Sequence, residues 1–137
     1  MSTAATFPID GVELSVLLVV RDLKRAEHFY GSVLGADHYD SYGGTTAVYQ
    51  FQGTWLIVTT EGGPTEDKPD IAMVAPVDPT KASVSLTMRV PSCQDAYDVL
   101  KGRGAQFVTP PYEREGEVRC FFHDPDGHLF EISERTS

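Results

Sequence analysis

One carboxylate stands out among the residues of this chain that could do chemistry. Glu131 lies between Phe130 and Ile132 in a stretch that reads as a strand. That strand follows a predicted tight turn at residues 124–128, Asp-Pro-Asp-Gly-His, in which proline presets one backbone angle and glycine can take a positive φ. Because a bare charge is too costly to bury, Glu131 must face solvent, a partner or a ligand.

Three roles are open for Glu131. It could form an ion pair with Arg89 across a sheet, or bind a cationic or hydrogen-bonding group of a ligand. It could also act as a general base if a poorly hydrated site raises its pKa. The neighbouring Asp124 and Asp126 are expected to brace their turn through local backbone hydrogen bonds rather than to catalyse.

Alternation along the predicted strands separates two faces of a sheet, because successive strand side chains point to opposite sides. The even-numbered positions are apolar and predict the face that packs against helices: Leu14, Val16, Leu18, Val20, Leu56, Val58, Val84, Leu86, Met88, Val90, Phe130 and Ile132. The odd-numbered positions mix apolar, hydroxyl and charged side chains, and those expected to bind a ligand are Ser15, Leu17, Trp55, Ile57, Ser85, Thr87, Arg89 and Glu131. A concave face with a few converging polar groups is typical of a small-molecule pocket. The alternative is a partly solvated face that binds nothing.

Further side chains are expected at the rim or wall of that pocket. Tyr112 lies in the proline-containing loop 109–116, and Arg119 and Phe121 lie on the next predicted strand. Trp55 could stack on a planar or cationic ligand, or it could pack only against the sheet.

The same order of strands and helix occurs twice in the chain, and these two repeats position the residues above. Residues 13–60 and residues 83–134 each predict a strand, a helix and three further strands, and the segment 61–82, rich in proline and charge, is a linker. Asp22 and Ser92 are the expected N-caps of the two helices. Each half is too small to bury much surface alone, so the halves should pair through their sheets in a single domain covering residues 1–137.

Composition excludes several classes of protein. The chain has 137 residues, 41% of them hydrophobic, and a net charge of −9, which argues against nucleic-acid binding. No apolar run reaches the roughly 18 residues of a membrane span, and residues 1–11 lack the order of a secretion signal. We therefore expect a cytoplasmic protein that does not bind membranes. Cys93 and Cys120 form no spacing motif and are expected to be reduced, structural thiols.

Two motifs resemble those of a known superfamily. Residues 20–26, Val-Arg-Asp-Leu-Lys-Arg-Ala, with Phe-Tyr at 29–30 and Val-Leu-Gly at 33–35, resemble the first motif of the vicinal oxygen chelate superfamily. That superfamily includes glyoxalases, bleomycin-resistance proteins and extradiol dioxygenases. The turn at 124–128 with Glu131 resembles its closing motif, so the match spans nearly the whole chain.

The resemblance implies an α+β fold in which two βαβββ modules pair into an eight-stranded half-barrel cup, usually in a homodimer. It leaves open whether the modules pair within one chain or across two. In metal-dependent members, His, Gln or Glu ligands stand at positions that correspond to Ser15, Ile57, Ser85 and Glu131. Of these only Glu131 is a credible ligand, whereas a divalent ion normally takes at least three protein donors. None of His28, His38, His123 and His128 supplies the missing donors, so we expect no cofactor, with a divalent metal as the disfavoured alternative.

The sequence therefore favours a metal-free protein of this superfamily that binds a small molecule, and one possible role is the sequestration of an antibiotic or toxic metabolite. The alternative is an enzyme of the same superfamily, a lyase, isomerase or dioxygenase. Such an enzyme would use Glu131 as a base without metal, or would hold a divergent metal site. A structural or regulatory domain with a vestigial cup is a third reading.

Overall fold

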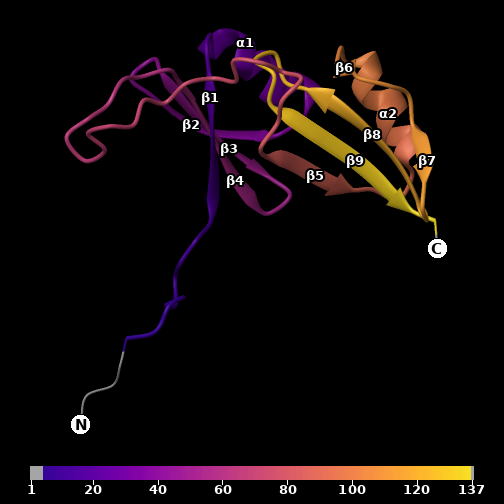
Figure 1. Ribbon diagram of the computed structural model, residues 1–137, viewed down its shortest axis with the longest axis horizontal. Helices are drawn as coiled ribbons and strands as arrows, with labels where there is room; N and C mark the ends of the chain where they lie inside the picture. The colour runs from indigo at the N-terminus through magenta and orange to yellow at the C-terminus, as the bar shows by residue number, and fades with distance from the viewer. Residues whose placement is uncertain (1–4, 137) are drawn as a thin grey trace.

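The computed structural model describes residues 5–136, which form two modules that each contain a β-α-β unit (Figure 1). The first module contains β1 (Ser15–Val20), α1 (Leu23–Glu27), the π-helix η1 (His28–Val33), β2 (Asp37–Tyr42), β3 (Thr46–Phe51) and β4 (Thr54–Thr60). The second contains β5 (Ser85–Arg89), α2 (Cys93–Gly102), β6 (Gln106–Phe107), β7 (Tyr112–Arg114), β8 (Glu117–His123) and β9 (Leu129–Arg135). The α+β class expected from the sequence is confirmed.

Each helix begins where the sequence predicts. The Asp22 carboxylate accepts from the Arg25 N–H at 3.1 Å, and the Ser92 hydroxyl accepts from the Asp95 N–H at 3.1 Å, so both side chains cap a first turn. The first helix then widens into a π-helix rather than continuing as an α-helix. Gly35 follows it with a φ of 80°, a value that favours glycine.

The structure adds one strand to the expected order. Residues 112–114, predicted as loop, form β7 and pair antiparallel with β8. The reversal between them is made by Glu115 and Gly116, which have φ values of 44° and 86°. Two consecutive residues with positive φ match the twist of a hairpin, so a two-residue turn can join β7 to β8.

The strands form two sheets that are not joined to each other in the described chain. The first has the order β1-β4-β3-β2, and the second has the order β5-β9-β8-β6 with β7 also beside β8. Within residues 5–136, β1 pairs only with β4 and β5 pairs only with β9, both in parallel. A continuous eight-stranded sheet would need a partner for each of these two free edges.

The modules instead pack through their apolar faces. Buried even-numbered residues form a shared core as the strand alternation predicts: Leu18, Val20, Leu56, Val58, Phe130 and Ile132. Phe29 from η1 reaches the second sheet, where its ring centroid lies 5.8 Å from that of Phe130. Two even-numbered residues predicted for this face, Leu14 and Val84, are exposed, because each lies one residue before its strand begins.

Cys93 and Cys120 are free and buried, with their Sγ atoms 3.8 Å apart, and burial raises the pKa of the Cys120 thiol to about 12. None of the helices in residues 5–136 is long and apolar enough to cross a membrane.

Candidate functional site

Strand register gathers predicted site residues on the outer face of the second sheet. Across β5, β9 and β8, one row consists of Thr87, Glu131 and Phe121. On one side of it, the next row reads, in order, Arg89, Ser133, Arg119 and Tyr112. On the other side, the predicted Ser85 pairs with Leu129. Seven of the predicted ligand-binding residues therefore lie together on one open face: Ser85, Thr87, Arg89, Tyr112, Arg119, Phe121 and Glu131.

The outer face of the first sheet carries the predicted ligand-binding residues of the first module. Ser15 pairs with Trp55, and Leu17 pairs with Ile57, across β1 and β4. Tyr39, which the sequence did not single out, lies against Trp55, with ring centroids 5.0 Å apart and an interplanar angle of 81°. Tyr39 is odd-numbered like Trp55, and the alternation counted on the other strands would have found it had it been extended to residues 37–42.

Charges on the second face leave Glu131 without a partner. The Glu117 carboxylate accepts from Arg119 Nη1 at 3.2 Å and lies 3.9 Å from Arg89 Nη2. Arg119 also lies over the Phe121 ring, 5.6 Å from its centroid. Throughout the part of the chain that the structure describes, Glu131 has neither a hydrogen bond nor an ion pair through its side chain. The proposed Glu131–Arg89 ion pair is therefore absent, because Arg89 is aligned with Ser133 and reaches Glu117 instead.

The two faces are not joined into one hollow within the chain. One cavity of about 720 Å³ lies beside β1 under residues 74–84 and is lined by Ser15 and Leu17. A second, of about 730 Å³, lies between β1, β4 and β5 and is lined mainly by apolar side chains, together with the predicted Ser85, Thr87 and Arg89. Neither cavity is lined by Trp55 or Glu131. Both cavities border the free edges of β1 and β5.

The donors at the four positions implied by metal-dependent members do not fit a divalent ion. Two are neutral hydroxyls, Ser15 and Ser85, and Ile57 has no donor atom, which leaves Glu131 alone. Among residues 5–136 no three His, Cys, Asp or Glu side chains are gathered as a metal-binding group. With Glu131 as the single donor, these four positions do not support a catalytic step through a metal.

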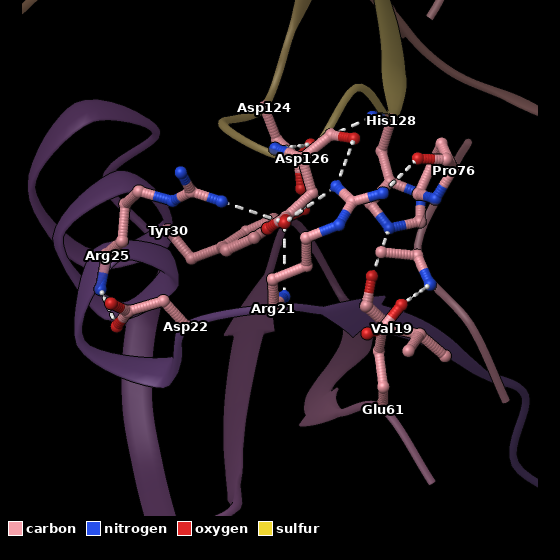
Figure 2. Close-up of polar contacts among 11 residues, drawn as sticks. Val19, Arg21, Asp22, Arg25, Tyr30, Glu61, Pro76, Asp124, Asp126 and His128 are labelled. Atoms are coloured by element: carbon pink, nitrogen blue, oxygen red, sulfur yellow. Dashed lines mark hydrogen bonds and ion pairs between the residues drawn. The ribbon is translucent and has the colours of Figure 1, made fainter. Parts of the chain in front are cut away.

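The turn before β9 does more than the local bracing expected of it. Asp124 Oδ1 accepts from the N–H groups of Asp126 and His128 at 2.9 and 2.8 Å, which is the expected bracing. Asp124 Oδ2 also accepts from the Tyr30 hydroxyl at 2.8 Å, and burial, with Asp124 adding to it, raises the Tyr30 pKa well above its usual value. The Asp126 side chain makes no bond within the turn and instead contacts Arg21 and Arg25 of the first module (Figure 2).

Comparison with known proteins places the chain in a family. The family model described as Glyoxalase/Bleomycin resistance protein/Dioxygenase superfamily matches residues 14–132. Because that match covers most of the 137 residues, the chain belongs to this superfamily.

Solved structures agree on the fold. A glyoxalase/bleomycin resistance protein/dioxygenase from Nocardioides is 22% identical with a TM-score of 0.76, over 98% of this chain and 87% of that one. TioX from Micromonospora sp. ML1 is 18% identical with a TM-score of 0.70, over 91% and 99%. A mutant of the fosfomycin resistance protein FosX from Listeria monocytogenes, complexed with Mn(II) and 1S,2S-dihydroxypropylphosphonic acid, is 20% identical with a TM-score of 0.65, over 90% and 89%. At these identities the likeness concerns the fold alone.

Proposed function

We propose that this protein binds a small organic molecule in the cytoplasm, without a metal ion, in a cup that two copies of the chain build together. The observation that carries the proposal is the pair of free edges at β1 and β5. A free strand edge presents unpaired backbone N–H and C=O groups, which favour pairing with another strand. If β1 of one copy pairs with β5 of the other, a four-stranded and a five-stranded sheet join into one.

That pairing would bring the two outer faces into one concave surface. Trp55 and Tyr39 would supply aromatic rings from one copy, and Phe121 and Glu131 would come from the partner copy. Neither cavity of the single chain is lined by Trp55 or Glu131, whereas ligand pockets bury most of their ligand. A homodimer would therefore hold two cups, each incomplete in a single chain.

The charges favour a ligand with a cationic or hydrogen-bond-donating group. Arg89 and Arg119, the two arginines predicted for the site, lie close to Glu117, so Glu131 is the carboxylate left to meet the ligand. The net charge of −9 would also raise the local concentration of cations around the protein. A role in sequestering an antibiotic or a toxic metabolite is consistent with these features.

A thermal-shift screen would identify the ligand class. Cationic antibiotics, aromatic metabolites and thiol conjugates would each be added to the purified protein, because a compound that binds only the folded state raises its melting temperature. We expect hits among planar compounds with an amine or amidine group. If only anionic compounds raised the melting temperature, the charge argument would be wrong.

Glu131→Gln tests the role of the unpaired carboxylate. A hydrogen bond to a charged group contributes about 1.5–3 kcal/mol, so we expect roughly 10- to 100-fold weaker binding of a cationic hit and little change for its neutral analogue. Isothermal titration calorimetry would measure both compounds. Glu113→Gln on β7, an exposed position, is the matched control. Equal losses in the two variants would argue against a specific contact with Glu131.

A second candidate function is a metal-free lyase or isomerase with Glu131 as the base. The partnerless carboxylate beside Phe121 favours this alternative to the same degree that it favours binding. Incubation with each hit, followed by mass spectrometry of the small molecule, separates the two. A binder returns the compound unchanged, whereas a base-dependent enzyme converts it and loses turnover in Glu131→Gln.

A further inference from the structure

The geometry points to a role for Arg21 and Asp126 that no cup residue has. We propose that their contact holds the two modules of one chain in an arrangement that leaves β1 and β5 apart, and so makes each module pair with a second copy. The inference rests on the two-copy cup proposed above. We call Arg21, Arg25, Tyr30, Asp124, Asp126 and His128 the clasp (Figure 2).

The clasp joins the start of the first helix to the turn before β9. Asp126 Oδ1 accepts from the Arg21 backbone N–H at 3.0 Å, from Arg21 Nη1 at 3.3 Å and from Arg25 Nη2 at 2.9 Å. His128 Nε2 donates to the Val19 carbonyl at 2.7 Å. These contacts link residues more than 100 positions apart in the chain, so they fix how the two modules sit against each other.

The clasp also holds the segment that connects the modules. Arg21 Nη2 donates to the Pro76 carbonyl, and His123 Nε2 lies 3.2 Å from the Pro79 carbonyl oxygen. Gly127 lies so close to this segment that a Cβ on it would be 3.2 Å from the Pro79 Cβ. The end of the linker is thus fixed to the same turn, and it cannot swing to bring β5 beside β1 while these contacts last.

The Asp126 carboxylate is buried in this contact, although removing a charge from water is costly. Its side chain has no exposed surface, whereas those of Arg21 and Arg25 are 43% and 48% exposed. Its second oxygen, Oδ2, is buried and finds no hydrogen-bond partner among residues 5–136. Buried charges of this kind add little net stability compared with apolar packing, and their best-attested role is to specify one arrangement over another.

Two modules can meet in two ways, through the clasp or through the free strand edges. In this chain the clasp is formed within the chain, so edge pairing is left to a second copy. If the clasp opened, the linker could let β1 pair with β5 of its own chain, at the high effective concentration of a tethered partner. The result would be a monomer with a closed cup. Each dimer contains two clasps, whereas such a monomer contains none. The dissociation constant of the dimer therefore changes by the square of the factor by which each clasp is weakened.

Asp126→Asn tests this, because asparagine keeps the shape and can still accept from the Arg21 N–H but loses the charge. If each clasp is weakened about tenfold, the dissociation constant of the dimer should rise about a hundredfold. Sedimentation velocity over a range of concentrations measures that constant. Asp98→Asn is the matched control, since Asp98 is exposed on α2 and its side chain accepts only from Gln94 in the described structure.

Hydrogen exchange of the β1 and β5 amides distinguishes a clasp that directs strand pairing from a clasp that only stabilises the fold. In the Asp126→Asn monomer we expect both strands to stay protected, because each is paired within the chain. A folded monomer whose β5 amides exchange freely would overturn the inference, and so would a folded variant with an unchanged dissociation constant. If Asp126→Asn does not fold, Arg25→Gln removes only one ion pair from a half-exposed side chain, and an unchanged dissociation constant there overturns the inference.

The wild-type protein separates this inference from the proposed cup. A dimeric wild type with dimeric clasp variants leaves the two-copy cup intact and overturns only the role of the clasp. A wild type that is monomeric at every concentration overturns the two-copy cup, and the inference with it.

Discussion

Thr87→Pro should convert the dimer into folded monomers. Val90 donates its N–H to the Ser133 carbonyl of β9 at 2.8 Å, so the backbone N–H groups of the even-numbered residues of β5 point to β9. The backbone N–H of Thr87, an odd-numbered residue, therefore points to the free edge. Proline lacks that N–H and is tolerated on an edge strand, where no hydrogen bond within the chain is lost. In the pairing with β1 of the second copy, the proline would remove one backbone hydrogen bond, and its ring would clash with the facing strand. We therefore expect the dissociation constant of the dimer, measured by sedimentation velocity, to rise at least a hundredfold.

Thr87→Ala is the matched control for that experiment. Alanine removes the same hydroxyl and methyl group but keeps the N–H, so it should remain dimeric. Circular dichroism should show the same strand content in both variants. If Thr87→Pro were folded and as dimeric as Thr87→Ala, the free edge of β5 would not be the dimer contact.

Phe122→Ala is expected to cause the largest loss of stability of any single truncation considered. The Phe122 side chain is fully buried, with its ring centroid 5.0 Å from that of Phe107, 5.2 Å from that of Phe130 and 6.3 Å from that of Phe29. Truncating a buried phenylalanine costs about 3–5 kcal/mol, out of a typical total of about 5–15 kcal/mol. Urea unfolding followed by circular dichroism would measure the free energy of unfolding.

The same experiment tests whether the two modules share one core. Phe29 belongs to the first module and Phe122 to the second, so the transition of the variant should remain single and move to lower urea as a whole. Val99→Ala, at an exposed position of α2, should change the free energy of unfolding by no more than about 0.5 kcal/mol. Two separate transitions in Phe122→Ala would show that the modules unfold independently.

Local features of this fold could be predicted from the sequence because their causes are local. The caps at Asp22 and Ser92, the positive φ of Gly127 and the burial of even-numbered strand residues each depend on a few neighbouring residues. The superfamily could also be identified from two motifs, and the family model agrees.

Features that depend on distant residues could not be predicted in the same way. No local pattern connects Arg21 with Asp126, which lie 105 positions apart, so the aspartate was expected only to brace its own turn. Of the three roles left open for Glu131, the ion pair with Arg89 is not formed in the described structure, because register, which the sequence does not give, places Glu117 within reach of Arg89. Tyr39 follows the same odd-numbered alternation as Trp55, and it was missed because the pattern was not applied to residues 37–42.

Native mass spectrometry of the purified protein with a hit from the thermal-shift screen tests the two-copy, metal-free cup most directly. We predict a complex with the mass of two 15.0-kDa chains that carries up to two ligand molecules and no metal ion. Ligand bound to a single 15.0-kDa chain would contradict the two-copy cup. Ligand bound only when a divalent ion accompanies it would contradict a metal-free site.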